Sequence, residues 1–340
     1  PWLAIGHGYL VGVLLTSSLM YAQGRLTGSF NPLPITMLLA VATLALAVVF
    51  SRNKRALQPA ARGASTSWEK VGVALLLLLI AQRLGLVAHE ALLRPLYAWD
   101  AWAAWVPQAR VWFEVGPSVL FTDMDTWIRA NADASLFTSQ SWNYPAFVPQ
   151  LFLWMMAAAG TADTTVIHLP WVFALVAMGC LVYGHLRVLG AIPLFALAAV
   201  FACVSLPLLG VHAALPGYAD IWLALALLGS TLALFEWRRT GSIACLLLAF
   251  VQGAACAWIK LPGAIFLALV LIALLLSTLR RRLFWLLFVI LSGAAVVAVG
   301  VFLGIDLTLP GGGRFVFDTR GISVPVLGSY TWEVNPAGRY

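Results

Sequence analysis

The sequence predicts an all-α polytopic membrane protein with about nine transmembrane helices and with interfacial helices in a large outer loop. Hydrophobic residues make up 62% of the 340 positions, and the mean hydropathy is +0.94. Charged residues make up only 10%, against about 25% in soluble domains. The runs 71–80, 221–234 and 265–276 are apolar around every helical face, which is typical of helices surrounded by lipid or protein.

Apolar segments that end at Gly, Pro or charged clusters are the predicted spans. They are residues 2–22, 34–51, 71–93, 164–184, 192–210, 218–236, 242–259, 262–279 and 284–305. We divide the chain into two N-terminal helices with a basic loop (1–70), a transmembrane module (71–305) with its outer loop (94–162), and a short outer-side tail (306–340).

Basic residues indicate which loops face the cytoplasm. Eleven of the 20 Lys and Arg fall in alternate loops: Arg52, Lys54, Arg55, Arg62, Lys70, Arg187, Arg238, Arg239, Arg280, Arg281 and Arg282. The acid-rich loops between them should therefore face outward. Segment 145–160 is apolar, but counting it as a span would reverse this charge bias. It is short and begins with a proline, so we expect an interfacial or re-entrant helix.

The net charge of +7 is explained by these topology signals, so no nucleic-acid partner is expected. Arg83 is the one charged residue that clearly falls inside a predicted span. We expect it to pair inside the protein, because a charge that faces lipid costs about 2.5–3.5 kcal/mol.

The outer loop carries residues suited to chemistry at a membrane surface. Residues 92–116 form an aromatic-rich amphipathic segment, which is typical of helices in the headgroup layer. Pro107 predicts a kink or two short helices there. Asp100 lies between Trp99 and Trp102, and it suits either a helix N-cap or a general base or metal ligand.

Further candidates fall on the same side of the membrane: Arg94, Arg110, Tyr144, His212, Asp220 and Lys260. Each has a structural alternative, since Lys260 suits a snorkelling anchor, Asp220 a helix cap and His212 a solvated loop residue. Together, acids and cations at one membrane face are what phosphate capture and base catalysis require.

Four motifs resemble those of the GT-C superfamily of membrane glycosyltransferases: YAWDAWAAWVPQAR (97–110), NYP (143–145), PGYAD (216–220) and IKLPG (259–263). Over residues 71–305 the chain is most similar to bacterial enzymes of the protein-mannosyltransferase and lipid A sugar-transferase group. The resemblance implies a bacterial inner (cytoplasmic) membrane, an active site that faces the periplasm, a polyprenyl-phosphate sugar donor and inversion at the anomeric carbon.

The resemblance also implies roles for individual residues. Asp100 matches the family's loop carboxylate, which acts as base or helps to hold a metal, and Asp220 and Lys260 match positions in the donor-phosphate region. Relatives carry a lysine where Gln108 stands, so phosphate contact is expected to shift to Arg110. The chain also departs from the family in its two extra N-terminal spans and its short tail.

The expected reaction uses a donor whose lipid phosphate is already a leaving group, which fits the lack of a GxxxxGK[ST] phosphate loop. Asp100 accepts the proton of the attacking hydroxyl, while Lys260, Arg110 or a metal stabilises the departing phosphate. Trp99, Trp102 and Trp142 are expected to stack on the sugar. Either no cofactor or a divalent cation (Mg²⁺ or Mn²⁺), with Asp100 and Asp220 as candidate ligands, is expected.

The expected partners are the polyprenyl-phosphate-linked sugar, membrane lipids and an acceptor glycan, lipid or protein. Two other classes of function stay open. One is a lipid-handling transporter or flippase, which would favour mid-membrane charges and broken helices. The other is a non-catalytic membrane subunit. The tail 306–340 suits either strand pairing or a lid over the site.

Overall fold

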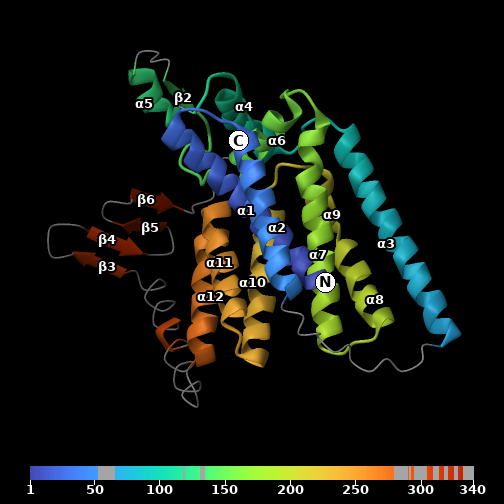
Figure 1. Ribbon diagram of the computed structural model, residues 1–340. Coiled ribbons are helices and arrows are strands. Elements are labelled where there is room, and N and C mark those ends of the chain that lie inside the picture. Colours follow the sequence, from blue (N-terminus) through green and yellow to red (C-terminus); the bar gives the residue numbers. More distant parts are fainter. Residues whose placement is uncertain are drawn as a thin grey trace. The chain divides into compact units, whose positions relative to one another are not determined.

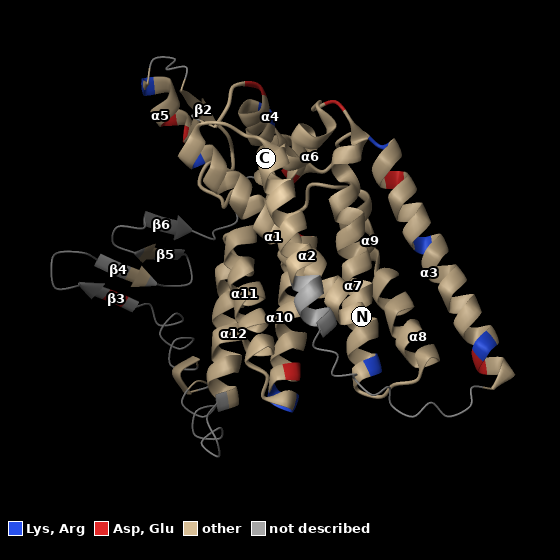
Figure 2. Ribbon diagram, in the orientation of Figure 1, with Lys and Arg blue, Asp and Glu red and all other residues tan. Residues whose placement is uncertain are grey.

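The computed structural model describes residues 1–52, 66–117, 119–130, 135–278, 290, 292–294, 305–308, 314–317, 321–324 and 328–331. It is 78% helical and divides into two compact units, Pro1–Ile272 and Ala273–Tyr340. In the first unit the long helices run beside one another (Figure 1), and charged residues gather mainly at helix ends (Figure 2).

Four helical segments of the first unit are long and apolar enough to cross a membrane. They are α1 (Trp2–Thr27), α3 (Ser67–Leu93), the continuous η2 (Thr165–His168) and α7 (Leu169–Val188), and α10 (Asp220–Thr240). The bent pair α8 (Pro193–Val204) and α9 (Pro207–Ala214) makes a fifth if it is counted as one span. The chain is thus a multi-pass α-helical membrane protein, as predicted.

Shorter apolar stretches occupy three further predicted spans within the described residues. They lie in α2 (Pro32–Arg52), α11 (Ile243–Ile259) and α12 (Gly263–Thr278), and a fourth lies in α6 (Phe147–Ala159), which was not predicted as a span. The last predicted span, 284–305, falls almost entirely outside the described residues, as do Arg280–Arg282 and most of the basic loop after Arg52.

The predicted span at 192–210 is not one straight helix, because the chain breaks there into α8 and α9, which are bent by 63°. Pro207 has no N–H and its ring clashes with the preceding turn, so a straight helix cannot continue through it. Helix α8 ends at Val204, and α9 begins at Pro207.

The outer loop begins with η1 (Ala101–Trp105), a π-helical turn that leads directly into α4 (Val106–Glu114). This confirms the predicted interruption near Pro107. The loop continues through β1 (Leu120–Thr122), α5 (Met124–Arg129) and β2 (Leu136–Thr138), and β1 pairs in parallel with β2.

The described residues of the second unit include four short strands that pair antiparallel in sequence order. They are β3 (Ile305–Thr308), β4 (Arg314–Phe317), β5 (Gly321–Val324) and β6 (Gly328–Thr331). Of the two possibilities for the tail, strand pairing is therefore present. These strands and the β1–β2 pair add small sheets that the all-α prediction did not include.

Helix α6 lies in the protein core, so of the two alternatives predicted for segment 145–160, an interfacial or a re-entrant helix, the interfacial one is corrected. Phe147, Phe152, Leu153 and Met156 are all fully buried, and α6 contacts α1, α4 and η2. An apolar run looks the same in sequence whether it faces lipid or protein, which explains the error.

A cluster of aromatic side chains joins α6 to α7 and α10. Phe152 stacks on Trp171 with ring centroids 4.7 Å apart, and Trp222 meets both Trp171 and Phe147 edge-on. The Trp171 indole N–H also donates a 2.9 Å hydrogen bond to the Tyr218 carbonyl. This core therefore fixes the loop that leads into α10.

Candidate functional site

Asp100, Asp220 and Lys260 meet at one end of the first unit. The Lys260 ammonium donates to both carboxylate oxygens of Asp220, at 3.0 and 3.1 Å. It also lies 3.8 Å from Asp100 Oδ2. The Lys260 side chain is 18% exposed, whereas those of Asp100 and Asp220 are 32% and 40% exposed. The cluster is thus a partly buried ion pair beside a second accessible carboxylate.

The connection between α10 and α11 explains why Asp220 and Lys260 are neighbours. The two helices pack against each other and are joined only by Gly241 and Ser242. They form a helical hairpin, so the first residue of α10, Asp220, lies beside the residue that ends α11, Lys260. The α10 N-terminus favours a carboxylate and the α11 C-terminus favours an ammonium, so the helix dipoles support both charges.

Asp100 stands at the start of η1 and makes no side-chain capping hydrogen bond. Asp100 therefore holds the N-cap position of η1, but its carboxylate does not cap the helix. Asp220 is not the N-cap of α10, because Ala219 holds that position. Lys260 is no free snorkelling anchor either, since its ammonium is paired with Asp220.

Gly217 brings the two halves of the cluster together. Its φ of +116° lies in the left-handed region that favours glycine, and a Cβ added there would overlap the Cβ of Ala101. Only glycine lets the loop before Asp220 contact the turn after Asp100 so closely. Gly217 was not predicted as a site residue, although the Pro–Gly dipeptide of the PGYAD motif is the sequence signal for such a turn.

Aromatic rings flank the charged cluster. The His212 ring stacks on Tyr218, with centroids 4.6 Å apart and an interplanar angle of 20°, and it lies within electrostatic range of all three charged groups. His212 belongs to α9, so it is not a solvated loop residue. Tyr218 is a member of the site that the sequence analysis missed.

Trp99 and Trp102 lie on either side of Asp100 in sequence and form an edge-to-face pair, with centroids 4.4 Å apart. They are 57% and 48% exposed. Half-exposed indoles beside a carboxylate offer an apolar ring face to a ligand. Trp142 is also exposed, at 44%.

Three of the predicted binding residues have partners of their own. Arg94 forms an ion pair with Glu90, and Arg110 Nη2 lies 2.8 Å from Asp163 Oδ1. The Tyr144 ring packs edge-on against Trp105, with centroids 5.4 Å apart. None of these contacts involves the Asp100–Asp220–Lys260 cluster.

Gln108 is buried in a polar network. Its side-chain amide donates to Ser139 Oγ at 2.8 Å and to the Ser141 carbonyl and hydroxyl at 3.1 Å each. These bonds tie α4 to the segment before α6, which is a structural role.

Arg83 has an internal hydrogen-bond partner, but none of the ion pairs among the described residues includes it, so the predicted pairing of its charge is not seen there. Its Nε donates a 3.4 Å hydrogen bond to the Val204 carbonyl, at the end of α8, where carbonyls lack intrahelical partners. Gly210 allows this approach, because a Cβ added there would overlap the guanidinium. The break between α8 and α9 is therefore where the intramembrane charge is held.

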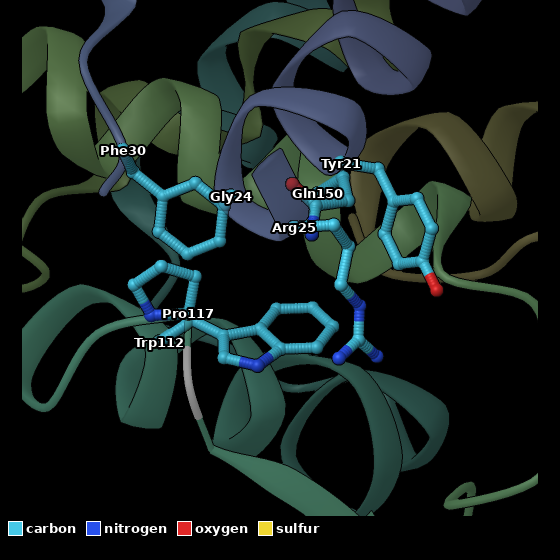
Figure 3. Close-up of a pocket in the computed structure, with 7 residues that line it drawn as sticks. All are labelled: Tyr21, Gly24, Arg25, Phe30, Trp112, Pro117 and Gln150. Carbon is cyan, nitrogen blue, oxygen red and sulfur yellow. The ribbon is translucent and has the colours of Figure 1, made fainter. Parts of the chain in front are cut away.

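A small niche lies between α1 and the outer loop (Figure 3). It is lined by Tyr21, Gly24, Arg25, Phe30, Trp112, Pro117 and Gln150 and has a volume of about 10 Å³. That is room for about one water molecule. Gln150 is 1% exposed, and among the described residues its Oε1 has no hydrogen-bond partner. The niche suits a buried water that donates to Gln150, and it is too small for a sugar.

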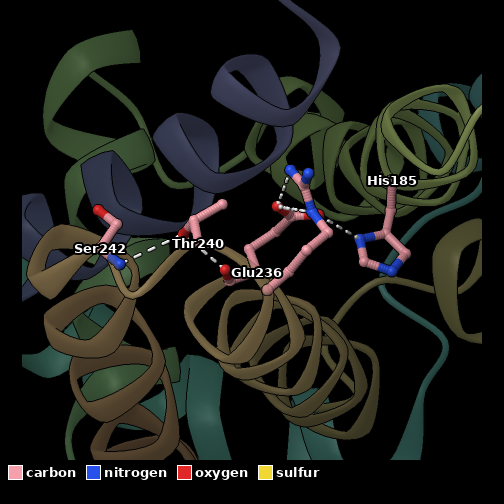
Figure 4. A network of polar contacts seen from close by, with 5 residues as sticks. His185, Glu236, Thr240 and Ser242 are labelled. Carbon is pink, nitrogen blue, oxygen red and sulfur yellow. Dashed lines mark hydrogen bonds and ion pairs between the residues drawn. The ribbon is translucent and has the colours of Figure 1, made fainter.

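A second charged cluster lies at the opposite end of α10 (Figure 4). Glu236 lies 3.4 Å from His185 Nδ1 through one carboxylate oxygen and 2.7 Å from Arg239 Nη2 through the other. Thr240 and Ser242 continue the polar contacts into the turn before α11. The cluster ties α7 to the α10–α11 hairpin at that end.

Asp100 and Asp220 were candidate ligands of a divalent cation, and in the structure the Lys260 ammonium lies between their carboxylates. Within the described part of the chain, no three His, Cys, Asp or Glu residues form a group that could hold a metal ion. Mg²⁺ is commonly bound by one or two carboxylates together with waters and substrate phosphates. Because the Lys260 ammonium lies between Asp100 and Asp220, a cation would bind both carboxylates only after Lys260 moves away.

Comparisons with known proteins give no relative: no protein-family model matches, and neither a curated protein nor a solved structure shows significant similarity. The class of this protein is therefore defined from its fold and its site alone. The chain is a multi-pass α-helical membrane protein with a carboxylate–ammonium–carboxylate cluster at the end of a helical hairpin.

Proposed function

We propose that the chain is an inverting glycosyltransferase of the GT-C type. It transfers a sugar from a polyprenyl-phosphate donor to a hydroxyl acceptor at the outer face of a bacterial inner membrane. The observation that carries the proposal is the meeting of Asp100, Asp220 and Lys260. The motif resemblance selected these three residues from distant parts of the chain.

The proposed topology has nine spans, with the site on the periplasmic side. The two ends of α10 support this orientation. Arg238 and Arg239 lie in its last turn, whereas Asp220 opens its first turn. The helix has 21 residues and is about 30 Å long, enough to separate a basic cytoplasmic end from the site.

Asp100 is the general base in this proposal. Its carboxylate takes the proton of the acceptor hydroxyl as the hydroxyl oxygen bonds to the anomeric carbon. The bond between that carbon and the phosphate oxygen breaks, and its electron pair leaves with the lipid phosphate. Attack from the face opposite the leaving group inverts the anomeric centre. A positioned base of this kind contributes about 10²–10⁴-fold to the rate.

Lys260 stabilises the leaving group. Its ammonium is held by Asp220 and points between the two carboxylates, so a phosphate that arrives there gains a fixed positive charge without reorganisation. Asp220 acts through Lys260 as a positioning residue. Arg110, which pairs with Asp163, is left out of this role.

Trp99 and Trp102 stack on the sugar, and the apolar faces of the spanning helices accommodate the prenyl chain. The paired indoles flank the base in sequence, which would put them near the sugar during transfer. A glycan, a lipid or a protein hydroxyl serves as acceptor.

The test is sugar transfer by purified protein from a panel of polyprenyl-phosphate sugars, with the wild type beside Asp100→Asn. The wild type should consume one of the donors, and Asp100→Asn should be slower by about 100-fold or more. Asp125→Asn, which removes an exposed carboxylate from α5 in the same outer loop, should retain full activity. Equal turnover by the wild type and Asp100→Asn would refute the assignment of the base.

A second candidate function is lipid transport, which one observation favours. The bent pair α8–α9 and Arg83 at its break together resemble the broken helices and buried charges of transporters. The two functions separate in liposomes: a transporter moves a labelled lipid between leaflets without consuming a sugar donor.

A further inference from the structure

A pocket of about 350 Å³ lies between α3 and α9, within the range of about 300–1,000 Å³ that is usual for ligand sites. Its polar lining comes from Arg83, Glu90, Arg94 and Tyr97. Its apolar lining comes from Leu86, Val87, Val211, Ala214 and Leu215, with Gly210 beside Arg83.

The positive and negative charges of the side chains that line this pocket do not cancel. Glu90 and Arg94 pair with each other, whereas none of the ion pairs among the described residues includes Arg83. The Val204 carbonyl occupies Arg83 Nε alone, so the two terminal nitrogens of the guanidinium remain as donors. The pocket therefore has a surplus of one positive charge.

A second cavity of about 330 Å³ continues along the same side of α3 and is lined almost entirely by apolar side chains. Helix α3 contributes Val73, Leu77, Ile80 and Leu84 to it. These residues recur every three or four positions, and the same pattern continues through Val87 to Arg94 in the first pocket. One face of α3 therefore lines both the pocket and the apolar cavity. Val204 lines the apolar cavity and accepts the hydrogen bond from Arg83, which marks the junction of the two.

We propose that this paired site binds one anionic glycerophospholipid of the surrounding bilayer, with its phosphodiester on Arg83 and an acyl chain along the apolar stripe of α3. A phosphodiester carries one negative charge, which would neutralise the charge of Arg83, and a guanidinium binds phosphate through paired N–H donors. The site is polar at the C-terminal end of α3 and apolar below it, which is the order of headgroup and chain in a phospholipid.

The surroundings of α3 identify the occupant as a bilayer lipid. Only 6% of the apolar window of α3 is buried, and Leu75, Leu78 and Leu86 are all more than half exposed. In a membrane these side chains are covered by lipid chains, so a lipid enters the groove from the side without crossing the protein.

Helix α9 separates this lipid site from the Asp100–Asp220–Lys260 cluster. Gly210 and Ala214 line the pocket, whereas His212 lies near the cluster. Residues two positions apart point about 200° apart around a helix axis. His212 therefore points away from Gly210 and Ala214, and the lipid proposal does not depend on the proposed activity.

The test is native mass spectrometry of the delipidated full-length chain, titrated with phosphatidylglycerol, phosphatidylcholine or a polyprenyl-phosphoryl sugar. The wild type should retain one phosphatidylglycerol in preference to the zwitterionic lipid. Arg83→Gln should weaken that binding by about ten- to hundredfold. Arg129→Gln, which removes an exposed arginine of α5, should bind like the wild type.

A second pair of variants keeps the arginine in place and guards against misfolding of Arg83→Gln. Gly210→Ala should weaken binding, because its Cβ displaces the guanidinium, whereas Gly85→Ala on α3 meets nothing within 4 Å and should not. Equal binding by the wild type and Gly210→Ala would overturn the proposal. Binding that depends on Arg83 but is confined to the polyprenyl-phosphoryl sugar would also overturn it.

Discussion

Lys260 and Asp220 hold each other through two hydrogen bonds of 3.0 and 3.1 Å across the open end of the α10–α11 hairpin. The pair fixes the ammonium 3.8 Å from Asp100. The charge next to the candidate base is therefore held in place by Asp220 and not by Asp100 itself. Asp220 therefore positions Lys260, and Lys260 is the group that can contact both a phosphate and Asp100.

Substitutions of Lys260 should separate charge from shape. Lys260→Met removes the ammonium and should lower kcat/KM for the lipid-linked donor by about 10²–10³-fold, because a preorganised charge in the transition state is lost. Lys260→Arg keeps the charge and should recover part of the activity. Initial rates over a range of donor concentrations measure the effect, and a Lys260→Met enzyme as fast as the wild type would exclude Lys260 from the reaction.

Asp220→Asn should act through Lys260 alone. It weakens the hold on the ammonium, so transfer should slow in the wild-type background but change little further in Lys260→Met. The coupling between the two residues in folding stability should be no more than about 1 kcal/mol, since Asp220 is partly exposed. A double-mutant cycle on kcat/KM and on thermal unfolding checks this, and additive kinetic effects would show that Asp220 has an independent role.

Gly217→Ala should damage the site through the backbone. The substitution meets both an unfavourable φ of +116° and the Ala101 Cβ, with an expected loss of about 1–3 kcal/mol of stability. Gly190→Ala is the matched control, because its φ is +88° and nothing lies within 4 Å. Both variants should lower the unfolding temperature, but only Gly217→Ala should reduce sugar transfer by displacing Asp220 from Asp100.

The sequence predicted the site in part because its members sit at helix ends. Asp220 and Lys260 flank a pair of apolar runs joined by a short turn, and two such helices must return to the same side of the membrane. Asp100 was selected by its aromatic neighbours and its motif. The membrane class followed from composition alone.

Other features depend on tertiary contacts that no local pattern encodes. Arg94 and Arg110 have the same local character as Lys260, yet the folded chain pairs them with Glu90 and Asp163. The burial of α6 and the close approach of Gly217 to Ala101 also depend on how distant segments pack. The break at Pro207 was readable in principle, because a proline inside an apolar run disrupts a helix.

Chelation should distinguish a lysine-based site from a metal-based one. Since the Lys260 ammonium already lies between the carboxylates, we expect sugar transfer to persist after treatment with EDTA and to gain little from added Mg²⁺ or Mn²⁺. Transfer assays before and after chelation measure this, with readdition of each metal as the control. Loss of activity that Mn²⁺ restores would instead assign Asp100 and Asp220 as metal ligands.

The outer loop should lose order in acid through Asp123, the N-cap of α5. The backbone N–H and the hydroxyl of Thr126 donate to its carboxylate at 2.9 and 2.8 Å, and these bonds hold the pKa of Asp123 below its usual value. A carboxyl whose pKa is lowered in the folded state contributes its full stabilisation of that state at pH values above its ordinary pKa of about 3.9. That stabilisation is lost as the pH falls through the lower pKa of the folded state.

Hydrogen-exchange protection of the Thr126 amide should therefore be constant from about pH 7 to 5 and decline below about pH 4. In Asp123→Ala the protection should be low at every pH, whereas Asp125→Ala should behave like the wild type. Protection in the wild type that does not change between pH 5 and pH values below the folded pKa would show that the cap does not control this helix.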